Sequence, residues 1–151
     1  MKGTRTVFSE NLNQGKYNAL EKQARLLGKI RSEVWQRFGS INGVGVNHRM
    51  IRTHWVKNRD FSPLPAKAWK ETLRDALDDI HLYEAACKEK VRRKIHARFK
   101  KDQDRKKYFK LLKYNDWINN PLLCRWMRQI KKHGKNHTHN QIILENGVYT
   151  V

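Results

Sequence analysis

Apolar side chains recur along most of the chain at the three- and four-residue steps that place them on one face of an α-helix. The first stripe consists of Tyr17, Leu20, Ala24, Leu27, Val34 and Phe38. Gly39 follows this stripe directly and indicates its end. A shorter segment carries Met50, Ile51 and Trp55. The pattern therefore predicts a long helix that ends near Gly39 and a short helix from about Asn47.

The longest apolar stripe begins after two prolines. Pro63 and Pro65 disfavour helix in the residues before them, and proline is well tolerated at a first helical position. Helical spacing then continues for about eight turns, through Trp69, Leu73, Ala76, Ile80, Tyr83, Cys87, Val91 and Ile95. Acidic residues gather in the first half and basic residues in the second, which suits the helix dipole. The dipole needs only one or two charges at each end, so the excess of cations indicates another cause.

Two more helices are predicted beyond this segment. Asp102 or Asp104 is a candidate cap for the first of them. Asn120 and Pro121 mark the start of the second, and Gly134 marks its end. The apolar faces comprise Tyr108, Phe109, Leu111 and Leu112 in the first helix, and Leu122, Leu123, Trp126, Met127 and Ile130 in the second.

The two ends of the chain have the composition of β-strands. Residues 4–8 alternate in character and include β-branched side chains. At the other end, two β-prone runs flank Asn146 and Gly147, a strong signal for a hairpin turn. The predicted fold is mainly α (α+β), with a basic helical bundle inserted between a short N-terminal strand and a C-terminal β-hairpin. Residues 1–10 and 138–151 would form a small β element, and residues 14–135 a helical region.

The second strand of the predicted hairpin runs to Val151, the last residue. A sheet of two or three strands would then have uncovered edges, which natural proteins normally protect. We therefore expect the chain to be a piece of a longer protein.

Net charge separates this chain from an ordinary globular domain. It has 33 Lys and Arg against 14 Asp and Glu, a net charge of +19. Such self-repulsion destabilises the compact state, so we expect a polyanionic partner, with nucleic acid favoured over an anionic membrane surface or an acidic protein. No apolar run reaches about 18 residues, so no membrane-spanning helix is predicted. With nucleic acid as the favoured partner, no membrane partner is expected. Two distant cysteines predict packed thiols in a reducing cytoplasm.

The strongest functional signal is the stretch VRRKIHARFKKDQDRKKYFKLLK, residues 91–113, in which cations alternate with aromatic side chains. A solvated helix face would normally mix both signs of charge, whereas acidic residues are few here. Lys and Arg side chains neutralise phosphates and release counterions. The predicted phosphate contacts are Lys88, Arg92, Arg93, Lys94, Arg98, Lys100, Lys101, Arg105, Lys106 and Lys107.

The aromatic side chains of this stretch have two interpretations. His96, Phe99 and Tyr108 are candidates for stacking on unpaired bases. Core packing is the favoured explanation for Phe99 and Phe109 taken individually. A second basic group on the last predicted helix adds further candidates for phosphate contact, although cations near a helix C-terminus are ordinary. These candidates are Arg125, Arg128 and Lys132.

Metal binding and catalysis are not predicted. His133, His137 and His139 lie in a polar loop with no Cys or carboxylate close by, so they do not supply the ligands of a zinc site. Asp75 and Asp79 share a helix face near an N-terminus, where dipole compensation explains them better than a magnesium site. We expect no catalytic residues, no metal and no cofactor.

The order of elements resembles a known family. A short first strand, a basic helical insertion and strands that resume at NQIILENGVYTV are similar to the N-terminal half of TnpB-like transposon-encoded RNA-guided nucleases and compact type V CRISPR effectors. The segment LPAKAWKETLRDALDDIHLYEAACKEKVRRKI resembles a helix of that family with a basic end. The resemblance implies the wedge and recognition regions, which hold the guide RNA and the guide–target duplex.

The family's catalytic part has no counterpart in this sequence. Neither the separated acidic residues of a RuvC-like nuclease half nor a CxxC zinc ribbon is present. The resemblance therefore implies a nucleic-acid-binding module of an RNA-guided DNA-targeting nuclease, with guide RNA and target DNA as partners and a nuclease half or other protein acting in trans. It also implies a prokaryotic, cytoplasmic and nucleoid-associated location.

Two other functions fit the sequence. In one, the segment NHRMIRTHW is the recognition helix of a small helix-turn-helix-like DNA-binding protein, and Arg49 and Arg52 contact base edges. In the other, the chain is a basic adaptor that binds an acidic protein.

Overall fold

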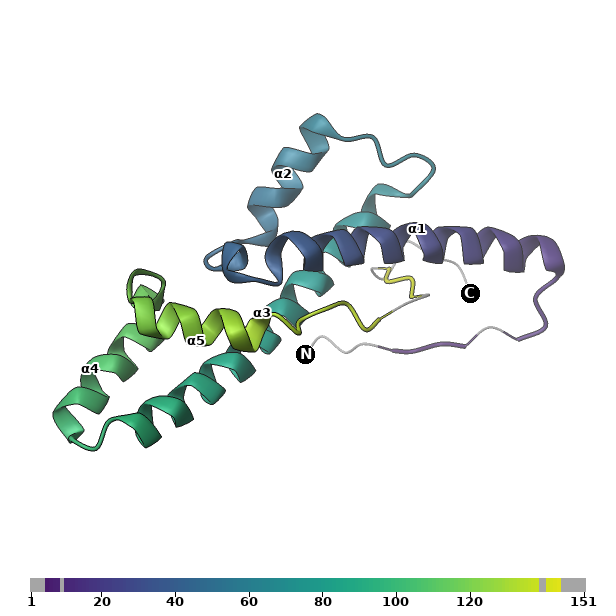
Figure 1. Ribbon diagram of the computed structural model, residues 1–151. Helices are drawn as coiled ribbons and strands as arrows, with labels where there is room; N and C mark the ends of the chain where they lie inside the picture. The colour runs from purple at the N-terminus through teal and green to yellow at the C-terminus, as the bar shows by residue number, and fades with distance from the viewer. Residues whose placement is uncertain (1–4, 9, 139–140, 145–151) are drawn as a thin grey trace.

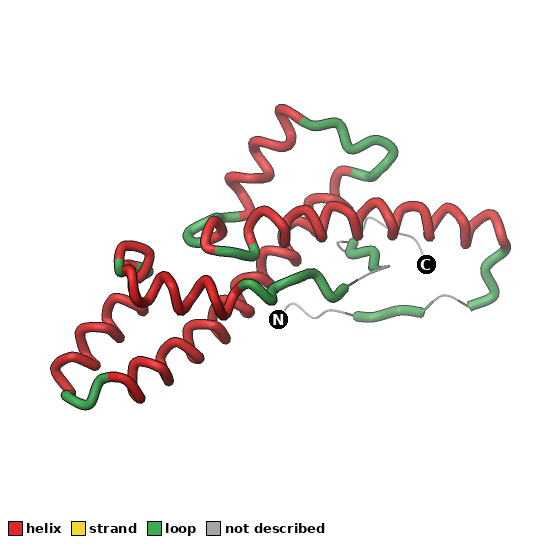
Figure 2. Tube along the Cα trace, viewed as in Figure 1, coloured by secondary structure: helices red, strands yellow, loops and turns green. Residues whose placement is uncertain are grey.

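The computed structural model describes residues 5–8, 10–138 and 141–144. Every regular element in this part of the chain is a helix (Figures 1 and 2). The α-helices are α1 (Gln14–Phe38), α2 (His48–Asn58), α3 (Ala66–Arg98), α4 (Asp102–Lys113) and α5 (Pro121–Lys131), and the short 3-10 helices are η1 (Ile41–Gly43) and η2 (Asp116–Asn119).

Helix α3 is the spine of the molecule. It crosses behind α1 and continues into the group formed by α4 and α5 (Figure 1). We call α1, α2 and residues 66–80 of α3 the first lobe. Residues 83–98 of α3, with α4, η2 and α5, form the second lobe. Each lobe has its own cluster of buried apolar side chains. Helix α3 therefore contributes side chains to two separate hydrophobic cores.

The first core gathers side chains from three helices. Trp55 of α2 lies at tilted angles to Phe61 and Trp69, while Phe61 and Trp69 stack with ring centroids 4.3 Å apart. The other buried residues of this core are Leu27, Ile30, Val34, Ile51, Ala68, Leu73, Ala76, Leu77 and Ile80. Helix α2 is therefore attached to α3 mainly by aromatic packing, which contributes more than area burial alone.

The second core is centred on Trp117, whose side chain is fully buried. It comes from η2, a segment in which sequence reasoning placed no element. The other buried members are Cys87, Val91, Ile95, Leu112, Leu123 and Met127. This core aligns α4 and α5 against the second half of α3, and the basic residues of these helices consequently lie on the outside.

Several helix ends follow the predicted signals. Asp102 and Asp104, however, lie inside the first turn of α4, which has Lys101 as its N-cap, and α5 ends at Lys131 rather than at Gly134. The side chains of Asn47 and Asn120 accept hydrogen bonds from the N–H groups of Arg49 and Leu123, which caps α2 and α5. Pro121 occupies the first turn of α5, where its missing N–H costs no hydrogen bond. The predicted helices near Gly39, Asn47 and Asn120 are therefore confirmed.

The predicted N-terminal strand and C-terminal hairpin are wrong as far as the described residues reach. Residues 5–8 and 141–144 contain no strand, and no sheet joins these two described segments. The hairpin turn at Asn146 and Gly147 lies outside the described residues. The part of the chain that can be described is mainly helical, without the β component of the expected α+β fold.

Apolar residues near the C-terminal end pack against helices. Ile142 and Leu144 pack against the core of the first lobe, and the Gln141 side chain lies 3.4 Å from the buried guanidinium of Arg31. These C-terminal residues are thus partly buried against helices rather than paired with another strand, whereas Val7 and Phe8 of the predicted N-terminal strand are 67% and 84% exposed. β-propensity reports the fit of a side chain to a half-buried surface more than a backbone preference, so the same residues suit both environments.

Polar contacts fix the joint between the two lobes. The Lys131 side chain, 1% exposed, places its Nζ 3.7 Å from Glu84 Oε2 of α3, and the same Nζ lies 3.4 Å from the carbonyl oxygen of Ser40. Tyr83 Oη donates a hydrogen bond to the Ile130 carbonyl oxygen at 3.2 Å. These contacts join the middle of α3 to the ends of α1 and α5.

Candidate nucleic-acid interface

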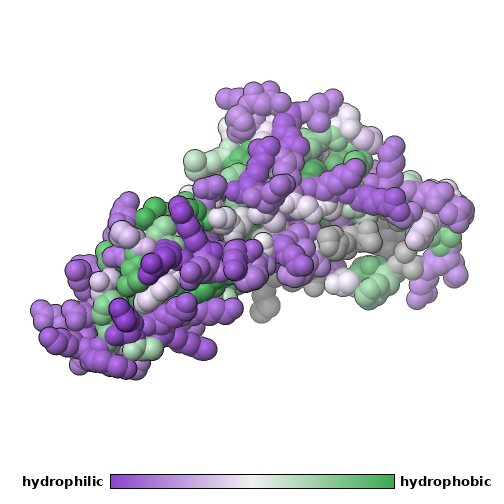
Figure 3. All heavy atoms as spheres, viewed as in Figure 1, coloured by the Kyte–Doolittle hydropathy of each residue, from purple (hydrophilic) through white to green (hydrophobic). Residues whose placement is uncertain are grey.

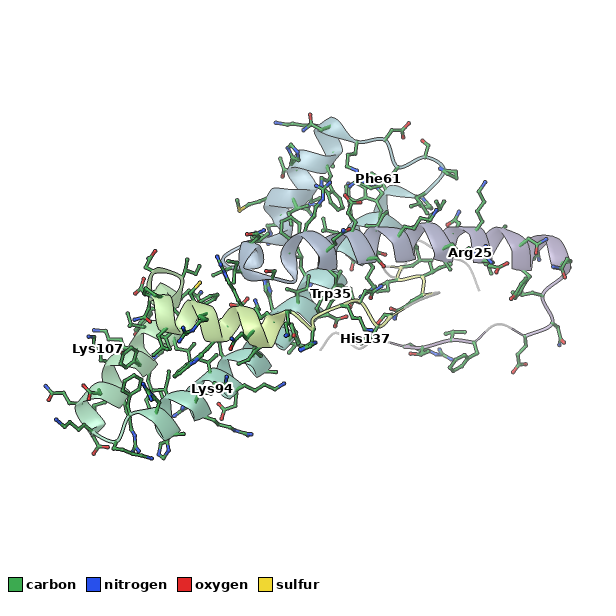
Figure 4. All side chains as sticks on the ribbon, viewed as in Figure 1. Arg25, Trp35, Phe61, Lys94, Lys107 and His137 are labelled. Atoms are coloured by element: carbon green, nitrogen blue, oxygen red, sulfur yellow. The ribbon has the colours of Figure 1, made fainter. Side chains whose placement is uncertain are left out.

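Most of the predicted phosphate contacts lie exposed on the second lobe. In Figure 3, hydrophilic side chains cover the outer end of this lobe, and Figure 4 marks Lys94 and Lys107 on it. Eight of the ten predicted cations of α3 and α4 have exposed side chains: Arg92, Arg93, Lys94, Arg98, Lys100, Lys101, Lys106 and Lys107. The fold therefore gathers them on one lobe from two helices and the turn between them.

Three consecutive cations spread over the three helices of this lobe. The Arg92 guanidinium lies over the Phe109 ring of α4, 5.2 Å from its centroid, and Lys94 Nζ lies 5.7 Å from the Trp126 ring of α5. Between them, Arg93 is 79% exposed and lies 3.7 Å from Glu89. Cation–π contacts of this kind orient a charged group without neutralising it. Arg92 and Lys94 consequently keep their positive charge.

The other two predicted cations have structural partners. Lys88 donates a hydrogen bond from Nζ to the Asn115 side chain at 2.6 Å and lies 3.8 Å from Glu84. Arg105 donates to the carbonyl oxygens of Phe99 and His96 at 2.5 and 3.1 Å. These carbonyls are the unsatisfied acceptors at the end of α3, so Arg105 caps that helix and fixes the turn into α4.

The stacking candidates are largely engaged with one another. Phe99 and Tyr108 stack with ring centroids 4.2 Å apart and planes inclined by 15°, and both are only partly exposed. Lys107 Nζ lies 5.7 Å from the centroid of the Tyr108 ring. Of the three candidates, only His96 has an exposed side chain. The surface therefore offers charge much more than free aromatic faces.

The second basic group extends the same lobe along α5. Arg125, Arg128 and Lys132 are exposed, whereas the neighbouring Lys131 is buried. The sequence did not identify Lys131 as the buried member of this basic group, because a run of cations does not show which one contacts Glu84. Its spacing from Leu123 and Met127 is the only signal, since the three residues fall on one helix face.

Carboxylates are scarce on the second lobe. Two of its ion pairs have an exposed carboxylate, Arg93–Glu89 at 3.7 Å and Arg105–Asp102 at 3.8 Å. Exposed pairs at such distances add little stability. Among the described residues, most cations of this surface consequently have no carboxylate within ion-pair distance, and a polyanion would supply the counter-charge.

Two acidic residues of α3, Asp75 and Asp79, form ion pairs with a buried arginine. Arg31 of α1, whose side chain is 3% exposed, donates to Asp75 and to Asp79, the latter at 3.1 Å. Burial, and then the nearby Asp75 carboxylate, raises the pKa of Asp79, while Arg31 opposes the rise. Sequence reasoning expected these carboxylates to compensate a helix dipole and missed Arg31 as their partner.

The described part of the chain contains neither a metal-ligand cluster nor a membrane-spanning helix. There, no group of three or more His, Cys, Asp and Glu residues could hold a metal ion, and His139 lies outside it. Among the described helices, none combines the length and the apolar character needed to cross a membrane.

The segment of the alternative DNA-binding hypothesis forms helix α2. α2 buries Ile51 and Trp55 against the first core and exposes Arg49 and Arg52. Met50, expected to face inward, is 68% exposed. The positive charge of Arg74, Arg52 and Arg49 lowers the pKa of His48, after the larger effect of burial. The first lobe thus carries a smaller basic cluster of its own.

Comparison of the chain with protein-family models, with curated proteins and with solved structures finds no match. The resemblance to TnpB-like nucleases therefore stays a prediction.

Proposed function

We propose that this protein is a nucleic-acid-binding module that holds a guide RNA and a guide–target duplex by the phosphate backbone. The supporting observation is the set of exposed cations on the second lobe, which has few carboxylates among them. Because phosphate contacts position a partner without reading its bases, sequence would be read by base pairing within the duplex.

The proposal includes a larger assembly. The protein acts with a nuclease half or a partner protein in trans, in the prokaryotic cytoplasm and in association with the nucleoid. We infer that this chain itself has no nuclease site, because Asp75 and Asp79 are occupied with Arg31. Cleavage of RNA or DNA in the presence of magnesium, lost in Asp75→Asn or Asp79→Asn, would contradict this inference.

A charge-matched pair of variants tests the binding surface. In the first, Arg92, Arg93, Arg98 and Lys101 are all replaced by Gln, which keeps helix propensity nearly level. In the control, four exposed first-lobe cations are replaced by Gln: Lys16, Lys22, Lys29 and Lys57. Both variants lose the same net charge, so a general charge effect changes both equally.

The measured quantity is the salt dependence of binding to a double-stranded RNA of random sequence. Each lost phosphate contact reduces the slope of log K against log salt by about 0.9, so the loss of four contacts should flatten it by roughly 3.5. The control should stay close to the wild type. An unchanged slope in a folded second-lobe variant, or an equal change in both variants, overturns the proposal.

Sequencing the nucleic acid that copurifies after a high-salt wash separates the remaining functions. One abundant structured RNA supports the guide-RNA interpretation. A broad set of DNA fragments supports the alternative in which α2 binds DNA, and the absence of nucleic acid supports an acidic protein partner.

A further inference from the structure

An open groove of about 650 Å3 lies where the two lobes meet. Its walls come from the start of α2 and from the turn between α4 and η2, and the middle of α3 forms its floor. Figure 1 shows the start of α2 and the turn after α4 on the same side of the α3 spine. The groove therefore exists only because α3 carries both lobes.

The charge of this groove differs from that of the second lobe. Arg49 and Lys88 line it together with the exposed Asp78 and with Glu84, which also contacts the buried Lys131. The lining thus presents both signs of charge, and Asp78 would repel a phosphate. A nucleobase edge, in contrast, presents donors and acceptors side by side, and the groove offers groups of both kinds.

Several lining groups are available for a ligand. Asp78 and His81 are exposed and form no hydrogen bond or ion pair within the described residues. Ala85 lies one turn further along the same face of α3 and is also exposed. A carboxylate, an imidazole and a small apolar side chain thus follow one another on the floor, which suits the edge and the flat face of a base.

The walls of the groove are held in place. Lys88 Nζ donates a hydrogen bond of 2.6 Å to Asn115 Oδ1, and this bond fixes the turn after α4. Asn115 itself has φ 61°, a left-handed conformation that Asn adopts more readily than most residues. On the opposite side, the Asn47 side chain caps α2 through the Arg49 N–H at 2.9 Å. The site is consequently formed before any ligand arrives.

The groove continues into the basic surface. Lys88 and Arg92 lie one helical turn apart on α3, about 6 Å along the axis, and Arg92 belongs to the exposed cations of the second lobe. On that lobe, Phe99 and Tyr108 stack on each other. Because those two rings stack on each other, the groove offers a separate site for an unpaired base next to the basic surface.

We propose that this groove binds one unpaired nucleobase of the nucleic acid whose backbone lies on the second lobe. This inference rests on the proposed function. Asp78 accepts hydrogen bonds from the amino or imino groups of the base, and the His81 ring contacts its face or edge. Arg49 and Lys88 donate to its carbonyl oxygens or ring nitrogens.

The test uses RNA duplexes that differ only at one central bulged position. Four probes carry an unpaired A, C, G or U, one carries an abasic residue, and one is fully paired. The preferred base should bind roughly tenfold tighter than the abasic probe, in the range of a single-base contact. Abasic binding equal to that of all four bases overturns the proposal.

Two variants connect this preference to the groove. Asp78→Asn and His81→Ala should each remove most of the difference between the best base and the abasic probe. Asp78→Asn should also tighten binding of every probe slightly, because it removes a negative charge. The matched controls Asp60→Asn and His137→Ala, at exposed positions outside the groove, should keep the preference.

The outcomes separate this inference from the proposed function. A normal salt slope with no base preference, or a preference that both groove variants retain, overturns the groove site alone. A slope that the second-lobe variant leaves unchanged overturns the proposed function, whatever the bulged probes show.

Discussion

Lys131 Nζ lies 3.7 Å from Glu84 Oε2, with the lysine side chain 1% and the glutamate side chain 10% exposed. The pair joins the last turn of α5 to the middle of α3, within hydrogen-bonding reach of the end of α1. A buried charge of either sign depends on its partner, because desolvation is costly for each ion alone. The orientation of the basic lobe therefore depends on a cation that no ligand can reach.

Breaking this pair should destabilise the protein. Glu84→Gln leaves Lys131 buried without its counter-charge and should lower the free energy of unfolding by about 3 kcal/mol, measured in urea. The double variant Glu84→Gln with Lys131→Met should recover most of that loss. Glu89→Gln, which affects an exposed pair, should change stability by less than about 0.5 kcal/mol. Equal losses in Glu84→Gln and Glu89→Gln would show that the buried pair carries no special stability.

Removal of Arg31 should have a pH-dependent effect. Arg31→Met leaves the Asp75 and Asp79 carboxylates facing each other without their counter-charge. This should lower the free energy of unfolding by about 2 kcal/mol near neutral pH. The loss is limited to that size because the half-exposed carboxylates can partly rehydrate. The pKa of Asp79 is already raised by burial and by Asp75, and loss of Arg31 should raise it further.

The sign of that effect follows from linkage. A carboxyl whose pKa is higher in the folded state favours folding in its protonated form, and this contribution is lost as the pH rises. The deficit of Arg31→Met should therefore shrink as the pH falls toward 3.8, the ordinary value for Asp. Urea unfolding across this range measures it, and a deficit independent of pH would contradict the role of the two carboxylates.

Tyr83 should contribute to stability below pH 10 and lose this contribution above it. Burial, and after it the hydrogen bonding of the Tyr83 hydroxyl to the Cys87 sulfur, raises the pKa of Tyr83 from 10.0 to about 12. Tyr83→Phe should cost about 1 kcal/mol near neutral pH through the lost bond to the Ile130 carbonyl. Because a raised pKa stabilises the folded state only below the unfolded value, the gap to the wild type should close between pH 10 and about 12. Tyr114→Phe, at an exposed position, should show neither effect.

His48 should titrate below its ordinary value of 6.5. Burial contributes most, and the positive charge of Arg74 comes next. Arg74→Gln should therefore raise the pKa of His48, as followed by NMR of the imidazole protons. Since the pKa is depressed in the folded state, His48 supports folding above pH 6.5 and this support is lost as the pH falls. A titration midpoint that Arg74→Gln leaves unchanged, as Arg25→Gln should, would exclude the charge effect.

The helices of this protein could be predicted because their signals are local. The stripe from Trp69 to Ile95 follows the helical period, and its members are buried in α3 apart from a partly exposed Tyr83. Asn47 and Asn120 cap the helices that they were expected to start. Tyr17 and Leu20 continue the stripe of α1, yet they are 53% and 45% exposed. Periodicity shows which side chains share a helix face, but not whether another element covers that face.

The sequence predicted which cations belong to the candidate site, but not which of them have structural partners. A run of cations on a helical segment places most of them at the surface, and eight of ten are exposed there. The roles of Lys88 and Arg105 depend on Asn115 and on the carbonyls of Phe99 and His96. These contacts arise only when α4 folds back against α3.

The sequence by itself determined the helical periodicity, the caps and the concentration of positive charge, since each depends on residues within a few positions of one another. Tertiary structure alone decided that Ile142 and Leu144 pack on helices and that Lys131 is buried against Glu84. It also decided that α2 and the turn after α4 enclose a groove. Burial and pairing depend on what lies across the space from a side chain, and no local pattern of residues carries that information.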